Sequence, residues 1–376
     1  MADKRDRWSK VGRIALYTLV WGVIAGYVLY SASLTRRHRQ SQRINRVEII
    51  ISDSAMHGNL ITTPMVRQWI TESKVEIMGR TLAELAIGDL EGSMLKNGFV
   101  NKAKIYPTYS GALRVEVEQR RPVMRLLMNG YNGYTTRDGY VFEAPNYASL
   151  YVPIITGDYK PPFPPSYRGS VAEFIKSESK RFEEQIIEIE REKYPLYERE
   201  QENMDDMREL RRMFIKQGWF ESSEAFDKRV VELRAKKVDL RKLYRYRSSV
   251  IAQQIEKISL KQRAVEEEKK KLIKRCEDFM NLINFVHIVE NDKFWSSEVV
   301  QIVAYQSQSG DLKVSLMVRS GDFEVLFGAV RDGEDSDGVK QRFDKLLEFY
   351  QNGLKRVGWN KYKTINVEYK NQVVCK

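Results

Sequence analysis

The three histidines are the side chains of this sequence best suited to acid–base or metal chemistry. His38 lies in an arginine-rich stretch, His57 in an expected loop, and His287 on one face of an expected helix. None of them belongs to a recognisable ligand set, and the sequence contains no GxSxG, P-loop or HExxH motif. We therefore predict that the protein is not an enzyme.

Four carboxylates lie in and beside the run GEDSDG, namely Asp332, Glu334, Asp335 and Asp337. Carboxylate oxygens are the ligands that calcium prefers, but the spacing of an EF-hand and its closing glutamate are missing. We interpret the run as a solvated loop, and the sequence predicts neither a metal nor a cofactor.

The two cysteines, Cys276 and Cys375, do not form a CxxC motif or a cluster with histidine, so no zinc site is predicted. Two cysteines are compatible with a reducing compartment and with an oxidising one, where they are either paired or buried. The sequence leaves the pairing open.

Residues 14–34 read IALYTLVWGVIAGYVLYSASL and contain no charge. At ~1.5 Å per residue a helix of this length spans roughly 30 Å, the hydrocarbon thickness of a bilayer. A buried core helix and a cleavable signal peptide are the alternatives. The length of the apolar run, and the arginines at 36, 37 and 39 that follow it, favour an uncleaved anchor. Five basic residues on each side leave its orientation undecided.

The net charge of +12 could indicate nucleic-acid binding. Residues 1–46, however, hold ten Lys or Arg and only two Asp, so most of the excess flanks the expected anchor. Anionic lipid headgroups would neutralise it there. No basic stripe with interleaved aromatic side chains occurs in the rest of the chain, so we predict a membrane-lipid contact and no nucleic-acid partner.

Residues 44–122 predict an order of strand, helix, helix, strand and strand. Apolar residues alternate over 47–52, 100–106 and 112–118, as in half-buried strands. Thr63-Pro64 predicts the start of the first helix, and the capping box Thr81-Leu-Ala-Glu84 predicts the start of the second.

Short apolar runs predict further strands in residues 123–157, broken by the turn dipeptides Asn129-Gly130, Asn132-Gly133 and Asp138-Gly139. Alternating and apolar runs predict strands again in 299–327. A proline-rich stretch, 161–165, reads as a stiff linker. Residues 339–357 have the apolar periodicity of an amphipathic helix, and residues 362–374 alternate as one final strand. These patterns predict a mixed β domain in two parts, 123–165 and 279–376.

Residues 170–278 separate those parts and contain two lines of mostly apolar residues that recur every seven positions. One line is Val230, Lys237, Tyr244, Ile251, Ile258, Val265, Leu272 and Phe279, and the other is Ile175, Phe182, Ile189, Leu196, Asn203 and Leu210. Such repeats predict coiled-coil helices. Gly218, the only glycine of this stretch, predicts a hairpin turn, and Pro195 predicts a break in the first helix because it lacks an N–H.

Several motifs carry a family resemblance. The strand–helix–helix–strand–strand order beside an anchor resembles a POTRA domain. MHG at 56–58, NGFV at 97–100 and QRRPV at 119–123 resemble the bacterial cell-division protein family FtsQ, called DivIB in Gram-positive bacteria. NQVVC at 371–375 resembles the Bacteroidetes form. The resemblance covers about 1–157 and 279–376, and the long insert departs from the family pattern.

The resemblance implies a divisome scaffold in the bacterial inner membrane. It implies a cytoplasmic tail over 1–13, a transmembrane helix over 14–34, a POTRA domain over 44–122, and most of the chain in the periplasm. It further implies that FtsB- and FtsL-like partners add a strand at the C-terminal edge of the β domain. The partner-binding residues that we predict on this basis are Ile365, Val367, Tyr369, Gln372 and Val373.

The expected fold class is therefore α+β, with one N-terminal anchor, a POTRA domain, and a mixed β domain interrupted by a coiled-coil hairpin. The insert is expected either to reach another divisome or cell-wall protein or to act as a solvated spacer. An alternative function is a POTRA-containing adaptor for outer-membrane protein assembly or secretion. Such adaptors usually carry several POTRA repeats or a barrel, whereas this sequence predicts one POTRA unit.

Overall fold

The computed structural model describes residues 18–33, 43–52, 60–81, 84–145, 149–331, 336–370 and 372–376. The chain forms two compact units. The first comprises residues 1–156, 165–168 and 297–303. The second comprises residues 157–164, 169–296 and 304–376.

Residues 18–33 are helical, and nearly all of their side chains are exposed. Among the described residues, no helix is both long enough and apolar enough to cross a membrane. The predicted anchor, 14–34, extends beyond the described residues at both ends.

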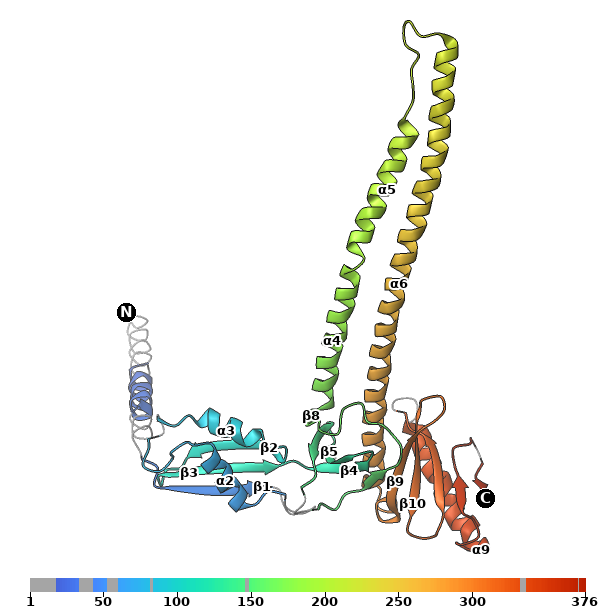
Figure 1. Cartoon of the computed structure of the whole chain (residues 1–376). Coiled ribbons are helices and arrows are strands. Elements are labelled where there is room, and N and C mark those ends of the chain that lie inside the picture. The colour runs from blue at the N-terminus through green and yellow to red at the C-terminus, as the bar shows by residue number, and fades with distance from the viewer. Residues whose placement is uncertain are drawn as a thin grey trace, which may run out of the picture. The chain divides into compact units, whose positions relative to one another are not determined.

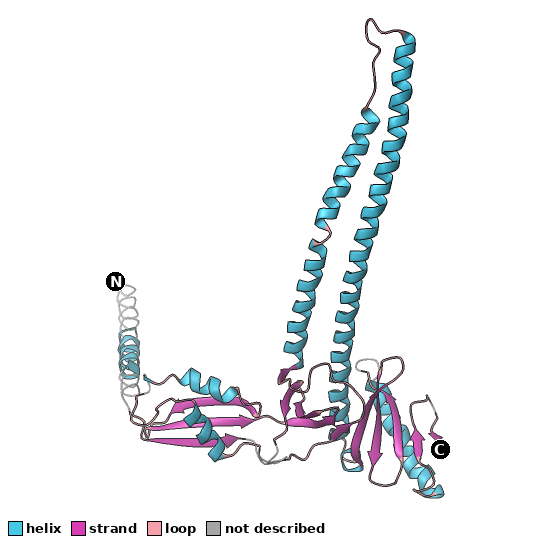
Figure 2. Ribbon diagram, viewed as in Figure 1, coloured by secondary structure: helices cyan, strands magenta, loops and turns pink. Residues whose placement is uncertain are grey.

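The POTRA-like part of the first unit follows the predicted order, which the structure confirms. Its elements are β1 (Arg46–Ser52), α2 (Thr63–Glu72), α3 (Ile87–Leu95), β2 (Val100–Pro107) and β3 (Ala112–Gln119). The strands form a sheet in the order β1-β3-β2, with β1 parallel and β2 antiparallel to β3. Figures 1 and 2 show this sheet and its two helices.

One apolar core joins this sheet to its helices. Leu90 and Met94 of α3 are buried, and the side chains of Val47, Ile49 and Ile51 pack against the same cluster from β1. The capping box lies before the helix that it was expected to start. The Thr81 N–H donates to Glu84 Oε2 at 3.1 Å, but α3 begins only at Ile87.

A further set of neighbouring strands in the first unit has the order β9-β7-β4-β5-β6. Its strands are β4 (Pro122–Met128), β5 (Tyr131–Thr136), β6 (Tyr140–Glu143), β7 (Ile154–Thr156) and β9 (Val299–Gln306), of which β9 belongs to this unit up to residue 303.

One of the turns predicted in this sheet is wrong. Asn129 and Gly130 form a turn with φ of 47° and 82°, as predicted, but Asn132-Gly133 lies inside β5. A Cβ at Gly133 would stand 2.8 Å from the Phe142 carbonyl oxygen. This glycine therefore permits close strand packing and does not form a turn.

A long helical hairpin belongs to the second unit (Figure 1). After β8 (Gly169–Ser170), α4 (Val171–Arg191) and α5 (Tyr194–Arg212) form one arm, and α6 (Ser223–Asn291) forms the other. The break between α4 and α5 falls next to Pro195, as predicted. The turn between the arms contains Gly218, also as predicted, and the Ser222 hydroxyl caps α6 by accepting from the Ala225 N–H.

The two predicted lines of residues with a spacing of seven face inward in this hairpin, because every residue in them is buried or half-buried. The helices run antiparallel. Near the base of the hairpin Lys269 pairs with Glu183 at 2.8 Å, and farther out the Asn203 amide donates to the Tyr244 carbonyl at 3.0 Å. A buried asparagine at a repeat position favours one register, since other registers leave it without a partner.

The proline-rich segment lies against the base of this hairpin. Phe163 is buried, and its ring meets Phe279 edge-on at 5.0 Å and Phe174 at 6.3 Å. The hydroxyl of Tyr159 donates to the Arg275 carbonyl at 3.2 Å. These contacts fix the segment where sequence composition indicated only a linker.

The remainder of the second unit contains part of a sheet, the neighbouring strands β13-β12-β11-β10, with helices beside it. An aromatic cluster joins the end of α6 to this sheet, since the rings of Phe285 and Phe327 lie 5.0 Å apart and those of Phe327 and Phe343 lie 4.6 Å apart. The elements are α7 (Trp295–Glu298), β10 (Leu312–Val318), β11 (Glu324–Ala329), α8 (Ser336–Phe349), the π-helical turn η2 (Tyr350–Leu354), α9 (Lys355–Val357), β12 (Thr364–Asn366) and β13 (Val374–Cys375).

Candidate partner-binding edge

The C-terminal segment does not form the single strand that we predicted over 362–374. Strand β12 has three residues and runs parallel to β11, with Val325 opposite Ile365. The next N–H, from Val367, still donates to the Leu326 carbonyl at 3.1 Å. After that the chain bends, and it returns as the two-residue strand β13, antiparallel to β12.

The outermost of the described strands in this sheet is β13. Lys376 and Thr364 exchange both of their backbone hydrogen bonds, at 3.0 and 3.1 Å. In an antiparallel pair, successive residues point their backbone groups alternately toward and away from the partner strand. The N–H and C=O of Cys375 therefore point away from β12, toward the side that another strand could occupy.

The five predicted site residues divide into two groups. Ile365 and Val367 are fully buried in the core, so their side chains do not offer a surface to a partner. Tyr369 is 50% exposed, Gln372 is exposed, and Val373 is half-buried. The structure thus brings three of them to the surface, on the segment that joins β12 to β13.

Helix α8 holds the segment that follows β12. The side-chain amine of Lys345 donates to the Val367 carbonyl at 2.9 Å and also to the Tyr369 carbonyl. These two carbonyls are therefore satisfied by a helix side chain and not by a neighbouring strand. That is the physical reason why the predicted strand ends at Asn366.

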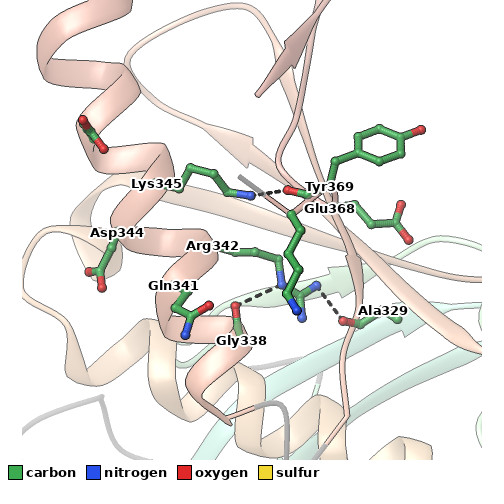
Figure 3. Close-up of a pocket in the computed structure, with 10 residues that line it drawn as sticks. Ala329, Gly338, Gln341, Arg342, Asp344, Lys345, Glu368 and Tyr369 are labelled. Atoms are coloured by element: carbon green, nitrogen blue, oxygen red, sulfur yellow. Dashed lines mark hydrogen bonds between the residues drawn. The ribbon is translucent and has the colours of Figure 1, made fainter. Parts of the chain in front are cut away.

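A groove of about 800 Å³ lies between α8 and this segment (Figure 3). Its walls carry charges of both signs, including Arg342, Lys345 and Lys370 on one hand and Asp344 and Glu368 on the other. Figure 3 shows the Lys345 side chain reaching across to the Tyr369 backbone. A mixed-charge groove of this kind suits polar peptide contacts.

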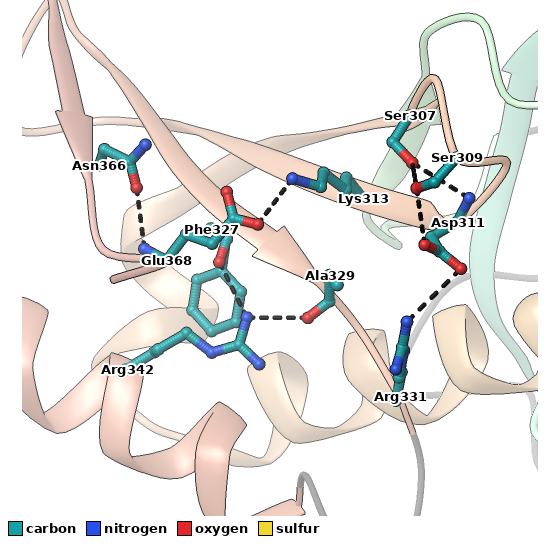
Figure 4. A network of polar contacts seen from close by, with 10 residues as sticks. All are labelled: Ser307, Ser309, Asp311, Lys313, Phe327, Ala329, Arg331, Arg342, Asn366 and Glu368. Carbon is teal, nitrogen blue, oxygen red and sulfur yellow. Dashed lines mark hydrogen bonds and ion pairs between the residues drawn. The ribbon is translucent and has the colours of Figure 1, made fainter. Parts of the chain in front are cut away.

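Polar contacts tie the same segment to the sheet (Figure 4). The Glu368 N–H donates to Asn366 Oδ1 at 2.9 Å, and the Glu368 carboxylate pairs with Lys313 of β10 at 2.6 Å. The Arg342 guanidinium donates to the carbonyls of Phe327 and Ala329 at 3.0 and 2.8 Å. Glu368 therefore ties the segment to β10, and Arg342 ties α8 to β11 beside it.

The electrostatics of the edge follow from these contacts. Burial, with the nearby Arg342 charge, lowers the pKa of Lys345. The hydrogen bond to Glu368 raises the pKa of Lys313. Burial raises the pKa of the Cys375 thiol, so this sulfur stays protonated and is not activated as a nucleophile.

Gly328 of β11 makes room for the segment. Its φ is +90°, and a Cβ there would stand 2.6 Å from Glu368 Cγ. The register of β10 and β11 shifts beside this residue, between Val314 and Ser315. Glycine is required here both by the backbone conformation and by the close approach.

The side chains considered for chemistry do not assemble into a site in the part of the chain that the structure describes. His287 lies on α6 within 2.9 Å of the Asn291 amide, and both cysteines are free thiols, Cys276 being buried. His38, His57 and the carboxylates of Asp332, Glu334 and Asp335 lie outside the described residues, as does the side chain of Asp337.

Sequence reasoning missed Lys345 and Cys375 as residues of this edge. Lys345 lies on the polar face of an amphipathic helix, where a lysine is usually solvated, so no local signal marks it. Cys375 was considered only for its thiol. The VVC stretch does have strand character, and that signal could have placed the edge there.

Two family models match the chain. Residues 42–118 match a POTRA-like domain, and residues 225–376 match the domain described as FtsQ/DivIB, C-terminal related. Together the two matches support an FtsQ/DivIB family protein. The two domains support a scaffold of the divisome type, and the FtsQ/DivIB family is membrane-associated.

The FtsQ/DivIB match has a consequence for the helical hairpin. It begins at residue 225, two residues after the start of α6, and continues to the final strand. All but the first two residues of the returning helix therefore belong to the matched C-terminal domain, although we expected the part up to residue 278 to depart from the family pattern. No curated protein matches the chain.

Proposed function

We propose that this FtsQ-type protein recruits FtsB- and FtsL-like proteins by adding a partner strand to β13. The observation that carries the proposal is the outermost position of β13, where the Cys375 N–H and C=O point away from β12. A partner strand gains backbone hydrogen bonds at such an edge, and its side chains select the partner.

Exposed side chains beside the edge would supply that selection. Tyr369 and Gln372 are exposed on the segment before β13, and Val373 is half-buried there. Tyrosine is a frequent anchor in protein interfaces because it combines a large apolar ring with a hydroxyl. Ile365 and Val367 support the edge from the core.

The proposal includes a topology in which residues 14–34 cross the inner membrane and the folded units lie in the periplasm. Family membership and the uncharged run in the sequence support it. Protease added to cells with a permeabilised outer membrane tests it. The folded units are expected to be cleaved while the inner membrane is intact, and their protection would contradict the topology.

Recruitment is tested by purifying the tagged full chain from membranes and measuring the FtsB- and FtsL-like proteins of the same organism that accompany it. The Tyr369→Asp variant is expected to lose most of both, because it places a charge beside the proposed contact. A Tyr109→Asp variant is the matched control, since Tyr109 is 82% exposed in the POTRA-like part. Equal recovery with Tyr369→Asp would remove Tyr369 from the interface.

A further inference from the structure

The turn at the end of the helical hairpin presents large apolar side chains to solvent. Trp219 is 95% exposed and Phe220 is 99% exposed, and Phe214 on the other side of the turn is 72% exposed. Single exposed aromatics are common on protein surfaces, but a cluster of this kind marks a contact site. The turn, residues 213–222, is called the tip below.

The tip is held in shape by polar contacts, and its aromatic side chains take no part in them. The Glu221 carboxylate accepts from the Gly218 N–H at 2.9 Å and forms a two-point pair with Arg229, one contact of which is 2.6 Å. The Arg229 guanidinium also donates to the Lys216 carbonyl at 3.3 Å. The backbone is therefore fixed while the rings of Trp219 and Phe220 stay outside.

Residues 211–229 hold five Lys or Arg and three Asp or Glu, and this positive excess favours an anionic surface. Arg211 and Arg212 end α5, and Lys216 lies in the turn with its ammonium 5.6 Å from the Phe214 ring centre. The carboxylate of Glu221, within the turn, is already neutralised by Arg229. Tryptophan beside lysine and arginine is the combination that settles at the lipid–water interface.

We propose that the tip inserts Trp219 and Phe220 into the interface of an anionic phospholipid bilayer. A protein partner is less suited to the geometry. A stable protein interface buries about 800 Å² on each side, and one convex turn of ten residues offers too little surface for that. A bilayer needs only the insertion of a few aromatic rings, and it accepts a convex shape.

The test places an environment-sensitive nitrobenzoxadiazole (NBD) label at the tip of the full chain. Gln217→Cys carries the label in a Cys375→Ser background, where the remaining Cys276 is fully buried. A label at Tyr246→Cys is the matched control, because Tyr246 is 67% exposed on the side of α6. Each protein is reconstituted in phosphatidylcholine vesicles with or without phosphatidylglycerol.

Brominated lipid is placed either in the same vesicles or in a second population added afterwards. We expect the label at residue 217 to be quenched in at least one arrangement. This quenching should be at least about threefold stronger in vesicles with phosphatidylglycerol than in vesicles without it, because each nearby Lys or Arg adds to the attraction. We expect the Tyr246 label to stay unquenched, and the double variant Trp219→Ser, Phe220→Ser to lose the quenching at 217 with its helix content unchanged by circular dichroism. An unquenched 217 label in both arrangements, or equal quenching in the double variant, would overturn the proposal.

Discussion

The side-chain amine of Lys345 is hydrogen-bonded to the backbone carbonyl of Tyr369, 24 residues farther along the chain. The same amine holds the Val367 carbonyl at 2.9 Å. One lysine on α8 thus sets the backbone between the buried strand β12 and the outermost strand β13. The proposed partner edge depends on this long-range contact, because β13 itself has only two residues.

Replacing Lys345 by methionine should loosen that segment. Two carbonyls would lose their donor while the apolar stem is kept, and the loss of hydrogen bonds to a charged group costs about 1–3 kcal/mol. Amide hydrogen exchange in residues 367–376 is expected to become roughly 10- to 100-fold faster. Lys340→Met is the control, because Lys340 is exposed on the same helix. Unchanged exchange in Lys345→Met would contradict the role.

Alanine substitution at two of the predicted site residues should affect different properties, partner binding at Tyr369 and folding stability at Ile365. Tyr369→Ala removes a half-exposed ring, so we expect nearly unchanged stability and partner binding weaker by about tenfold or more. Ile365→Ala empties a fully buried position, so we expect a loss of about 2–5 kcal/mol in the free energy of unfolding. Urea unfolding and titration with the partner separate the two effects. A large stability loss in Tyr369→Ala would show that the ring is structural.

Gly328→Ala should disturb the edge without touching it. The φ of +90° disfavours alanine, and the new Cβ would collide with Glu368, which pairs with Lys313. We expect a destabilisation of about 1–3 kcal/mol, the usual cost of a strained backbone residue. Gly310→Ala is a useful comparison, because its φ is +79° but its Cβ would meet open space. Equal losses in the two variants would assign the effect to the backbone alone.

The contact between Lys274 of α6 and Asp311 should make stability depend on pH. Their side chains lie 2.8 Å apart, and this hydrogen bond, followed by that from Ser309, lowers the pKa of Asp311 to about 2. A carboxyl whose pKa is lower in the folded state stabilises the fold above its unfolded pKa of 3.8, and that contribution is lost as the pH falls toward 2.

Asp311→Asn should therefore be less stable than the wild type at pH 7, by about 1 kcal/mol for a partly exposed pair. The difference in urea unfolding free energy should shrink between pH 4 and pH 2, because the wild-type carboxyl also becomes neutral there. Asp278 lies nearby with a raised pKa, caused mainly by burial, so the comparison is made between the two proteins and not within one pH profile. A difference that is independent of pH would contradict the assignment.

Local pattern was enough to predict the helical hairpin and the POTRA-like part. In the hairpin, apolar residues every seven positions define a face, Gly218 supplies the turn, and Pro195 removes a donor, all within a short stretch of sequence. In the POTRA-like part, alternation and helix-start signals placed the five elements in the right order. These features depend on neighbours along the chain, which a sequence displays directly.

The C-terminal edge could not be predicted in the same way. The alternation of Ile365 and Val367 with Asn366 and Glu368 correctly indicates an inward and an outward face, but it would place Tyr369 inward, whereas Tyr369 is 50% exposed. It also does not say which strand lies beside these residues or in which direction. The bend after Val367 depends on Lys345 and Gly328, which are distant in sequence. The helix at residues 18–33 is a different case, because the described part is shorter than the uncharged run that predicts the anchor.

The proposed strand addition requires one backbone group, the N–H of Cys375, as a hydrogen-bond donor. Cys375→Pro removes this N–H but leaves the hydrogen bonds between Lys376 and Thr364, whereas Cys375→Ser keeps the N–H and changes only the side chain. The decisive measurement is the affinity of each full-length variant for the FtsB- and FtsL-like proteins, with thermal unfolding as the check on folding. We expect Cys375→Ser to bind like the wild type and Cys375→Pro to bind at least about tenfold more weakly, as the loss of an edge hydrogen bond at a proline implies. Wild-type affinity in a folded Cys375→Pro protein would contradict strand addition at β13.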